Sequence, residues 1–247
     1  MKPLPADLGS AATLHGLSAF TTVRTRLGRP LLLAEHLARL AATCVFLGLP
    51  APEDDLPLLE ALPWGLLRLT VTTQDTFWTH LPLSPPVVPA LGVSVRLTDI
   101  QIHPQLGRHK TGNYLPYLLA RREAEAHGAF EGLLTGGAGH IADASRSGLL
   151  FRSDEGWFVP EAGLPSVTRS AWLAELGLTE SERAATVRPV PLDLLRQARH
   201  VWLCGAGIGI VPVGRITGGT VNTGDGWEQT YAADWPQTRH PALVIPG

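Results

Sequence analysis

Lysine is scarce in this sequence. Only two of the twenty basic residues are lysines, Lys2 and Lys110, and all the others are arginines. The acidic residues number 22, so the formal net charge is −2, and no basic run is longer than Arg121-Arg122. A near-neutral chain without a basic patch has no electrostatic attraction for a phosphate backbone. The composition therefore predicts that nucleic acid is not a partner.

Cysteines and long apolar runs are scarce as well. The two cysteines, Cys44 and Cys204, are far apart in apolar surroundings, which is typical of buried thiols rather than of a disulfide framework or a zinc site. No stretch approaches the ~18 consecutive apolar residues of a membrane-spanning helix. The beginning of the chain, with two prolines and an aspartate, is unlike a secretory signal. We expect a cytoplasmic protein without membrane association and without a bound metal.

What is present suffices for a folded protein of two parts. The 247 residues are 45% hydrophobic and 17% charged, which excludes disorder and allows one or two packed cores. Residues 82–89 form a proline-rich run, PLSPPVVP, which is stiff and cannot donate to a sheet. We therefore expect a small N-terminal α+β domain over 1–83, a linker over 84–90 and a larger C-terminal domain over 91–247.

Local patterns predict both helices and strands, so the fold class is α+β. Apolar residues at three- and four-residue steps predict helices over 34–47, 111–127, 168–176 and 192–198. A turn over 27–30 predicts a hairpin between strands at 17–26 and 31–33. Runs rich in β-branched and aromatic residues predict the remaining strands, at 66–73, 77–81, 93–97, 131–135, 140–143, 148–151, 157–159, 201–204 and 210–216.

Lys110 is the first candidate for chemistry. It lies where an irregular segment meets the predicted helix 111–127. A lysine amine that is partly buried can lose its proton and attack a carbonyl to form a Schiff base, which arginine cannot do. A chain that otherwise uses arginine has a specific use for lysine where amine chemistry matters. Coding bias explains the same count, and composition alone leaves both explanations open.

Two other segments carry candidate residues, but local sequence favours plain structural roles for them. Ser166 and Thr168 supply hydroxyls and backbone N–H groups at the start of a predicted helix, which suits a phosphate. Read alone, Thr168 is better explained as the N-cap. His36 and Arg39 share one face of helix 34–47. Their spacing alone favours a packing role for His36 and a position on the solvent-exposed face of the helix for Arg39.

Six segments, taken in order, resemble the class IV aminotransferases. They are residues 20–24 (FTTVR), 35–40 (EHLARL), 110–115 (KTGNYL), 139–151 (GHIADASRSGLLF), 167–169 (VTR) and 212–213 (PV). This family contains pyridoxal-phosphate (PLP) enzymes of fold type IV, among them branched-chain aminotransferases, D-amino-acid aminotransferases and 4-amino-4-deoxychorismate lyases. The resemblance covers about residues 16–216. It implies the two-domain architecture of the D-amino-acid aminotransferase-like enzymes, and a homodimer.

The resemblance also implies what single residues do. Lys110 would form the Schiff base with PLP and later move the substrate proton. Arg39 would hold the cofactor phosphate, together with the backbone and hydroxyl of Val167 and Thr168. Tyr114 would lie near the phenolic oxygen of the cofactor.

The cofactor's ring would be held by Asp143, where this chain departs from the family pattern. Asp143 falls where the family has a glutamate that pairs with the protonated pyridine nitrogen and makes the ring an electron sink. Gly148 stands where asparagine is usual, Ser166 replaces a glycine, and Ala206 replaces a threonine or serine that offers its hydroxyl to the phosphate. These departures put the strength of cofactor binding in doubt.

The resemblance implies a small-molecule amine or amino-acid substrate, and it favours one reaction over two alternatives. Residues 20–22 (FTT) and Gly209 resemble the lyase branch, which forms 4-aminobenzoate and pyruvate from aminodeoxychorismate. The segment after Lys110 occurs in both branches, and Gly205 replaces an asparagine of the lyases, so an aminotransferase for branched-chain or D-amino acids is the second hypothesis. A catalytically degenerate protein with this fold is the third, motivated by Asp143, Gly148 and Ala206.

Overall fold

The chain forms two compact units in a computed structural model that describes residues 9–53, 55–218 and 226–246. Unit 1 comprises Met1–Ser84 and His109–Tyr114, and unit 2 comprises Pro85–Arg108 and Leu115–Gly247. This division differs from the expected one, in which 109–114 belongs to the second domain and 84–90 is a linker. The reason is backbone pairing: Phe20 N donates to Lys110 O at 2.8 Å, and Gly112 N donates to Ser18 O at 2.8 Å.

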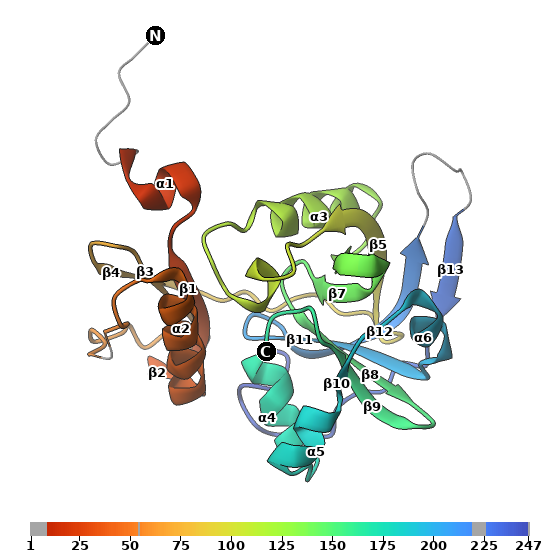
Figure 1. Ribbon diagram of the computed structural model, residues 1–247. Helices are drawn as coiled ribbons and strands as arrows, with labels where there is room; N and C mark the ends of the chain where they lie inside the picture. The colour runs from red at the N-terminus through yellow and green to blue at the C-terminus, as the bar shows by residue number, and fades with distance from the viewer. Residues whose placement is uncertain (1–8, 54, 219–225, 247) are drawn as a thin grey trace. The chain divides into compact units, whose positions relative to one another are not determined.

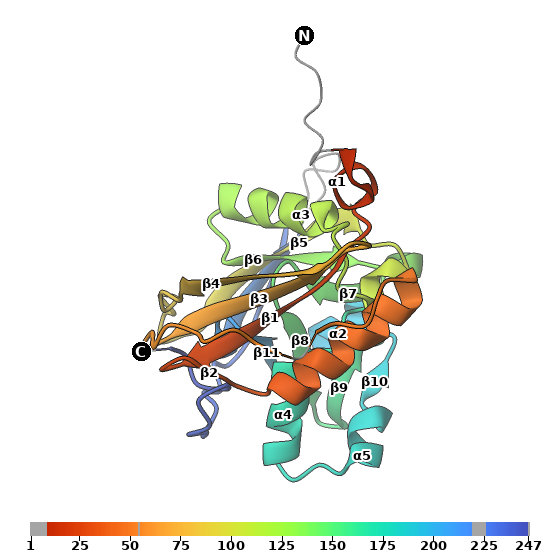
Figure 2. The ribbon, with the colours of Figure 1, turned by 90° about the vertical axis from the view of Figure 1, so that its left-hand side faces the viewer.

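Unit 1 is a small antiparallel sheet with one long helix against it. Its described elements are α1 (Ala11–His15), β1 (Ala19–Arg26), β2 (Arg29–Pro30), α2 (Leu33–Leu47), β3 (Gly65–Val71) and β4 (Thr76–Pro82). The strand order is β2-β1-β3-β4, and α2 packs on β1 (Figure 1, Figure 2). Alternate residues of β3 are buried against α2 and β1, as the period of a half-buried strand requires. The core of unit 1 therefore lies between the sheet and α2.

The predicted hairpin and the predicted helix 34–47 are confirmed. The second strand of the hairpin is Arg29–Pro30 rather than the expected 31–33, because the turn takes only Leu27 and Gly28 and the chain leaves the sheet after Pro30. Leu32 then takes a left-handed conformation, with φ 55°, and α2 begins at the next residue. The helix ends at Gly48, whose φ of 66° is accessible to glycine at little cost.

Unit 2 contains one large mixed sheet. Nine strands within the described residues belong to it: β5 (Val93–Gln101), β6 (Glu131–Thr135), β7 (Ile141–Ala144), β8 (Gly148–Ser153), β9 (Gly156–Pro160), β10 (Val187–Arg188), β11 (His200–Gly205), β12 (Gly209–Gly218) and β13 (Trp227–Thr230). Their order is β10-β9-β8-β11-β12-β5-β6-β7, with β13 paired to β12. The pairs β12–β5, β5–β6 and β10–β9 are parallel, and the other pairs are antiparallel. The α+β class is thus confirmed.

The helices of unit 2 cover this sheet. They are α3 (Leu115–Ala126), α4 (Val167–Glu175), α5 (Glu180–Ala185) and α6 (Leu192–Gln197). Helix α3 lies over β5 and β6 (Figure 1, Figure 2). It begins four residues later than predicted, because 109–114 pairs with β1 and because Pro116 is tolerated only in a first turn. Helix α5 is an element that the periodicity did not predict.

Three expectations about composition can be compared with the structure. Cys44 and Cys204 are both buried and free, as predicted. No helix in the described ranges is long and apolar enough to cross a membrane. Within those same ranges, no three His, Cys, Asp or Glu side chains are grouped as metal ligands would be.

Candidate functional site

Lys110 is held by unit 1 rather than by the helix that follows it. Its carbonyl accepts the amide of Phe20, and the next residue, Thr111, forms an isolated bridge with Ala19. The ring of His109 stacks on Phe46 of α2 at a centroid distance of 3.9 Å. The lysine backbone is therefore fixed both to β1 and to the C-terminal end of α2.

Aromatic rings surround the half-buried amine of Lys110. Nζ donates to the hydroxyl of Tyr114 at 3.1 Å, and it lies 4.7 Å from the ring centroid of Phe20 and 4.8 Å from that of Tyr114. The two rings meet edge to face at 5.3 Å. Lys110 is the one lysine within the described residues. The structure thus brings together Lys110 and Tyr114, two of the residues that the resemblance singles out.

Arg68 of β3 is a functional candidate that the sequence reasoning missed. Its guanidinium carbon lies 3.6 Å from the ring centroid of Phe20, the ring that also contacts Lys110. Burial lowers the pKa of Arg68, and the nearby Tyr114 opposes this shift. The side chain bonds Thr70, and within the described residues it forms no ion pair. A second cation thus lies beside the lysine, where it favours an anionic group.

Arg39 does not lie on a solvated face, which corrects the interpretation from spacing. It is partly buried, and its Nη2 donates to the hydroxyl of Thr21 on β1 at 3.0 Å. His36, one turn earlier on α2, is buried and has its Nδ1 3.0 Å from the same hydroxyl and 3.5 Å from Arg39 Nη2. The sequence marks Thr21 only as part of the lyase-like segment 20–22, because nothing local shows that a strand threonine contacts residues of a helix that follows it.

His36 is neutral in this arrangement. Burial lowers its pKa to about 3, with further lowering by the positive charges of Arg39 and Lys110. Neutral imidazole has one donor and one acceptor nitrogen. Arg39 can only donate, so the Thr21 oxygen accepts from it. Because Arg39 Nη2 also lies 3.5 Å from His36 Nδ1, an unprotonated Nδ1 is favoured, with the Thr21 hydroxyl donating to it and the ring hydrogen on Nε2.

Asp143 lies in unit 2, on β7, and its side chain is only 4% exposed. Its Oδ1 accepts the amide of Ala144 at 3.0 Å, and its Oδ2 accepts the amide of Leu164 at 3.2 Å. The loop before α4 approaches so closely that a Cβ at Gly163 would lie 3.4 Å from the Asp143 carboxyl carbon. The carboxylate is thus fixed between its own strand and this loop.

The N-terminus of α4 presents free donors, although Thr168 is not its N-cap. Ser166 is the N-cap, because its side chain accepts the amide of Arg169. Ser166 Oγ also donates to Cys204 O at 3.2 Å, which ties the helix start to the end of β11. Within the described part of the chain, the amides of Val167 and Thr168 and the Thr168 hydroxyl have no hydrogen-bond partner. Three such donors at the positive end of a helix suit a phosphate.

Arg169, the next residue of α4, is a buried cation close to Asp143. Its Nη1 donates to Leu149 O at 2.9 Å. Burial lowers the pKa of Arg169, while Cys204 and Asp143 oppose this shift. The guanidinium stays protonated, so it stabilises the ionised form of the Asp143 carboxyl.

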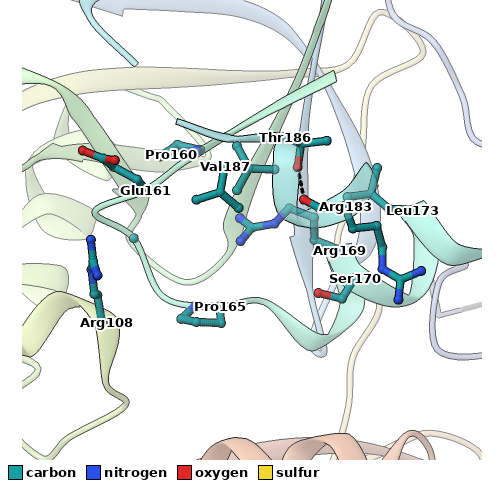
Figure 3. Close-up of a pocket in the computed structure, with 12 residues that line it drawn as sticks. Arg108, Pro160, Glu161, Pro165, Arg169, Ser170, Leu173, Arg183, Thr186 and Val187 are labelled. Atoms are coloured by element: carbon teal, nitrogen blue, oxygen red, sulfur yellow. Dashed lines mark hydrogen bonds between the residues drawn. The ribbon is translucent and has the colours of Figure 1, made fainter. Parts of the chain in front are cut away.

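A cavity of about 370 Å³ lies beside α4 and α5 (Figure 3). Its polar lining comes from Arg108, Glu161, Arg169, Ser170, Arg183 and Thr186. Two of these guanidinium groups are already committed to carbonyls, Arg169 to Leu149 and Arg183 to Leu178 at 2.6 Å. Arg169, from the segment 167–169 of the resemblance, lines this cavity, whereas Arg39, Lys110, Tyr114, Asp143, Val167 and Thr168 do not. The cavity therefore shares Arg169 with the candidate site but none of the residues expected to hold the cofactor.

Comparisons with known proteins agree with this geometry. The profile of the amino-transferase class IV family matches residues 18–216. The crystal structure of a proposed 4-amino-4-deoxychorismate lyase is 38% identical to this chain, with a TM-score of 0.72 over 86% of this chain and 88% of that one. The aminodeoxychorismate lyase of Vibrio harveyi is 23% identical over 239 residues, 85% of this chain and 87% of that protein.

A further relative shares the fold. The PLP-bound form of a hypothetical aminotransferase from Mycobacterium tuberculosis is 23% identical, with a TM-score of 0.66 over 87% of this chain and 86% of that one. These likenesses confirm the fold type IV architecture that the sequence implied. The family profile and the 38% identical relative each span most of the sequence. The chain therefore belongs to the class IV aminotransferase family.

Proposed function

We propose that this chain is a PLP-dependent 4-amino-4-deoxychorismate lyase that forms 4-aminobenzoate and pyruvate. The observation that carries the proposed PLP chemistry is the amine of Lys110, half-buried between Phe20 and Tyr114, and the resemblance implies that this lysine forms the Schiff base. The choice of the lyase over the aminotransferase rests on residues 20–22 and Gly209 and on the relatives. Supporting it, the relative that is 38% identical is a proposed lyase, and the Vibrio harveyi relative is named as one.

The residues present fit PLP. The unpartnered donors of Val167 and Thr168 suit its phosphate, as does the guanidinium of Arg39. Asp143, a carboxyl that interacts electrostatically with Arg169, is suited to a protonated pyridine nitrogen. Lys110 would attach the cofactor covalently, with Tyr114 beside it. Because Ala206 has no hydroxyl, the donors at the start of α4 bind the phosphate in this proposal.

When bound, PLP supplies an electron sink for the pair of electrons left on the substrate carbon that bears nitrogen. Lys110 Nζ removes the proton from that carbon. The Tyr114 hydroxyl, which accepts a hydrogen bond from Nζ, keeps the amine oriented. Arg68, whose guanidinium lies over the Phe20 ring, attracts the carboxylate of the substrate. The lyase reaction then expels pyruvate, and the ring becomes aromatic.

An amino-acid aminotransferase remains the second candidate. It is favoured by residues 110–115, which both branches of the family share. Its reaction begins with the same proton removal by Lys110 and ends with a keto acid. Nothing about the Lys110 geometry separates the two reactions, so substrate trials must do so.

We further propose that the protein is a cytoplasmic homodimer. Strand β4 is an edge strand with apolar side chains exposed on both faces, and Phe77, Trp78 and Leu81 are 53%, 48% and 63% exposed. A long apolar edge strand is a pairing hazard unless it is covered, and a second copy would cover it. Two buried free thiols suit a reducing compartment.

The test combines a spectrum with two substrate assays. With added PLP, the purified protein should show a visible absorption band that Lys110→Ala and Lys110→Arg lack. The arginine variant keeps the positive charge but not the nucleophile, so it is the matched control. With aminodeoxychorismate, the protein should release equal amounts of 4-aminobenzoate and pyruvate.

Each other outcome refutes part of the proposal. Absence of the band would refute PLP attachment at Lys110. A band without lyase products above the Lys110→Ala level would refute the lyase. In that case, conversion of the cofactor to its pyridoxamine form by an amino acid, without an acceptor, would establish the aminotransferase.

A further inference from the structure

Three polar side chains meet inside unit 1, between β1 and α2. Thr21 is fully buried, His36 is 4% exposed and Arg39 is partly buried. The Thr21 hydroxyl oxygen lies 3.0 Å from Arg39 Nη2 and 3.0 Å from His36 Nδ1. The hydroxyl of Thr43 also donates to the backbone carbonyl of Arg39 at 3.1 Å. The arginine is thus held at its guanidinium and at its backbone.

The position of Arg39 indicates the hydrogen-bond directions in this cluster. Arg39 has donors only, so its Nη2 hydrogen goes to the Thr21 oxygen. The same Nη2 lies 3.5 Å from His36 Nδ1, and a donor this close favours an unprotonated Nδ1 that accepts the Thr21 hydrogen. If His36 were protonated, no ring nitrogen would remain to accept that hydrogen. Two cations would then lie 3.5 Å apart.

We propose that Thr21 and His36 are positioning residues for Arg39: His36 orients the Thr21 hydroxyl, and Thr21 fixes the guanidinium plane in the orientation that receives the cofactor phosphate. The inference rests on the proposed function, since it takes Arg39 as a phosphate ligand. Arg39 is long and rotamer-rich, and fixing such a side chain before binding is worth roughly 2- to 12-fold in affinity.

The test compares two cofactor forms that differ at the phosphate alone. PLP and pyridoxal both carry the aldehyde that reacts with Lys110, but pyridoxal has no phosphate. The ratio of their dissociation constants therefore isolates the phosphate contacts, and it is a binding measurement that requires no turnover. We would titrate the cofactor-free protein with each form and follow visible absorbance and tryptophan fluorescence.

Thr21→Val should weaken PLP binding roughly 2- to 12-fold and leave pyridoxal binding unchanged. Thr21→Ser keeps the hydroxyl and should keep the wild-type ratio of the PLP and pyridoxal dissociation constants. His36→Leu removes the acceptor and should resemble Thr21→Val. His36→Asn keeps an acceptor oxygen near the position of Nδ1 and should retain most of the ratio. In an Arg39→Gln background, Thr21→Val should have no further effect on the ratio.

The matched control is Thr25→Val. Thr25 is a fully buried threonine on the same face of β1, and its hydroxyl is bonded to another histidine, His80 Nε2, at 2.8 Å. Removing it costs a comparable buried hydrogen bond but leaves Arg39 untouched. It should therefore lower the melting temperature about as much as Thr21→Val without changing the PLP-to-pyridoxal ratio.

The outcomes separate this inference from the proposed function. A wild-type protein that binds neither PLP nor pyridoxal refutes the proposed function, and this inference with it. If the wild-type protein binds PLP normally, the positioning role alone is overturned in either of two cases. One is that Thr21→Val weakens both forms equally. The other is that Thr21→Val still lowers the ratio when Arg39 is already Gln.

Discussion

Acidification should destabilise the protein through His36. The side chain is buried between β1 and α2, accepts the Thr21 hydroxyl and lies near the charges of Arg39 and Lys110. These surroundings lower its pKa in the folded protein from 6.5 to about 3. In the unfolded chain His36 is exposed to water and regains a pKa near 6.5. Folding therefore requires a neutral His36.

The sign and size of the effect follow from proton linkage. Between pH 6.5 and pH 3 the unfolded chain binds one proton at His36 that the folded chain does not, so stability falls as the pH falls. The slope is about 1.4 kcal/mol per pH unit for one proton. From pH 6.5 to pH 4.5 this histidine alone should remove about 2–3 kcal/mol, and above pH 6.5 its effect vanishes.

Other groups titrate in the same range, so a variant must isolate the histidine. Burial raises the pKa of Glu131. Acidification therefore stabilises the fold through Glu131, opposite to its effect through His36. We would measure the free energy of unfolding in urea from pH 4.5 to 7.5 for wild type and for His36→Asn. The variant loses stability at neutral pH, but its pH dependence should be flatter than that of wild type by about 1 kcal/mol per pH unit.

The matched control is His80→Asn, which removes a half-exposed histidine bonded to Thr25 on the same strand. Flattening of the pH dependence in His36→Asn that is absent from His80→Asn supports the assignment to His36. Proton NMR of the His36 ring gives a direct reading and should show no titration between pH 5 and pH 8. A His36 resonance that titrates near pH 6.5 in the folded protein, or equal slopes for wild type and His36→Asn, would refute the reasoning.

Two further predictions concern packing and assembly. A Cβ at Gly148 would lie 2.8 Å from Ser166 Cβ and 2.9 Å from Arg169 Nη1, so Gly148→Ala should lower the unfolding free energy by about 1–3 kcal/mol in urea titrations. The loss of unfolding free energy caused by Gly148→Ala should be smaller in a Ser166→Gly background. An equal loss in that background would contradict the steric explanation. By light scattering the wild type should have twice its 26.4 kDa chain mass. Trp78→Lys on β4 should shift the measured mass toward that of a single chain. Leu58→Lys, at a fully exposed leucine outside the sheet, should leave the mass unchanged. A dimeric Trp78→Lys variant would exclude β4 as the dimer interface.

Elements that depend on local signals were predictable from the sequence. Helix α2 combines a regular apolar stripe with Gly48 at its end, and both signals act within a few residues. Helix α5 has a local signal as well, a capping box between Thr179 and Glu182. It was overlooked because its six residues carry no apolar stripe, and none of its residues is buried.

Elements that depend on distant partners were not predictable in this way. The segment His109–Tyr114 has a composition compatible with a helix start, and only its pairing with the region of β1, about ninety residues earlier in sequence, keeps it irregular. The same holds for Arg39. Its spacing from His36 is compatible with a solvated face, and only the Thr21 hydroxyl on another element makes it part of a buried cluster.

Two departures from the family pattern, Gly148 and Ser166, are explained by their contact with each other in the structure. Taken singly, Gly148 and Ser166 suggest a weakened site, since each differs from the usual residue. In the structure the two positions face each other, and the space that a side chain at 148 would fill is occupied by Ser166 Cβ and the guanidinium of Arg169. Ser166 in turn caps α4 and bonds Cys204 O. The two departures therefore compensate for each other, and they keep the donors of α4 and the cation beside Asp143 in place.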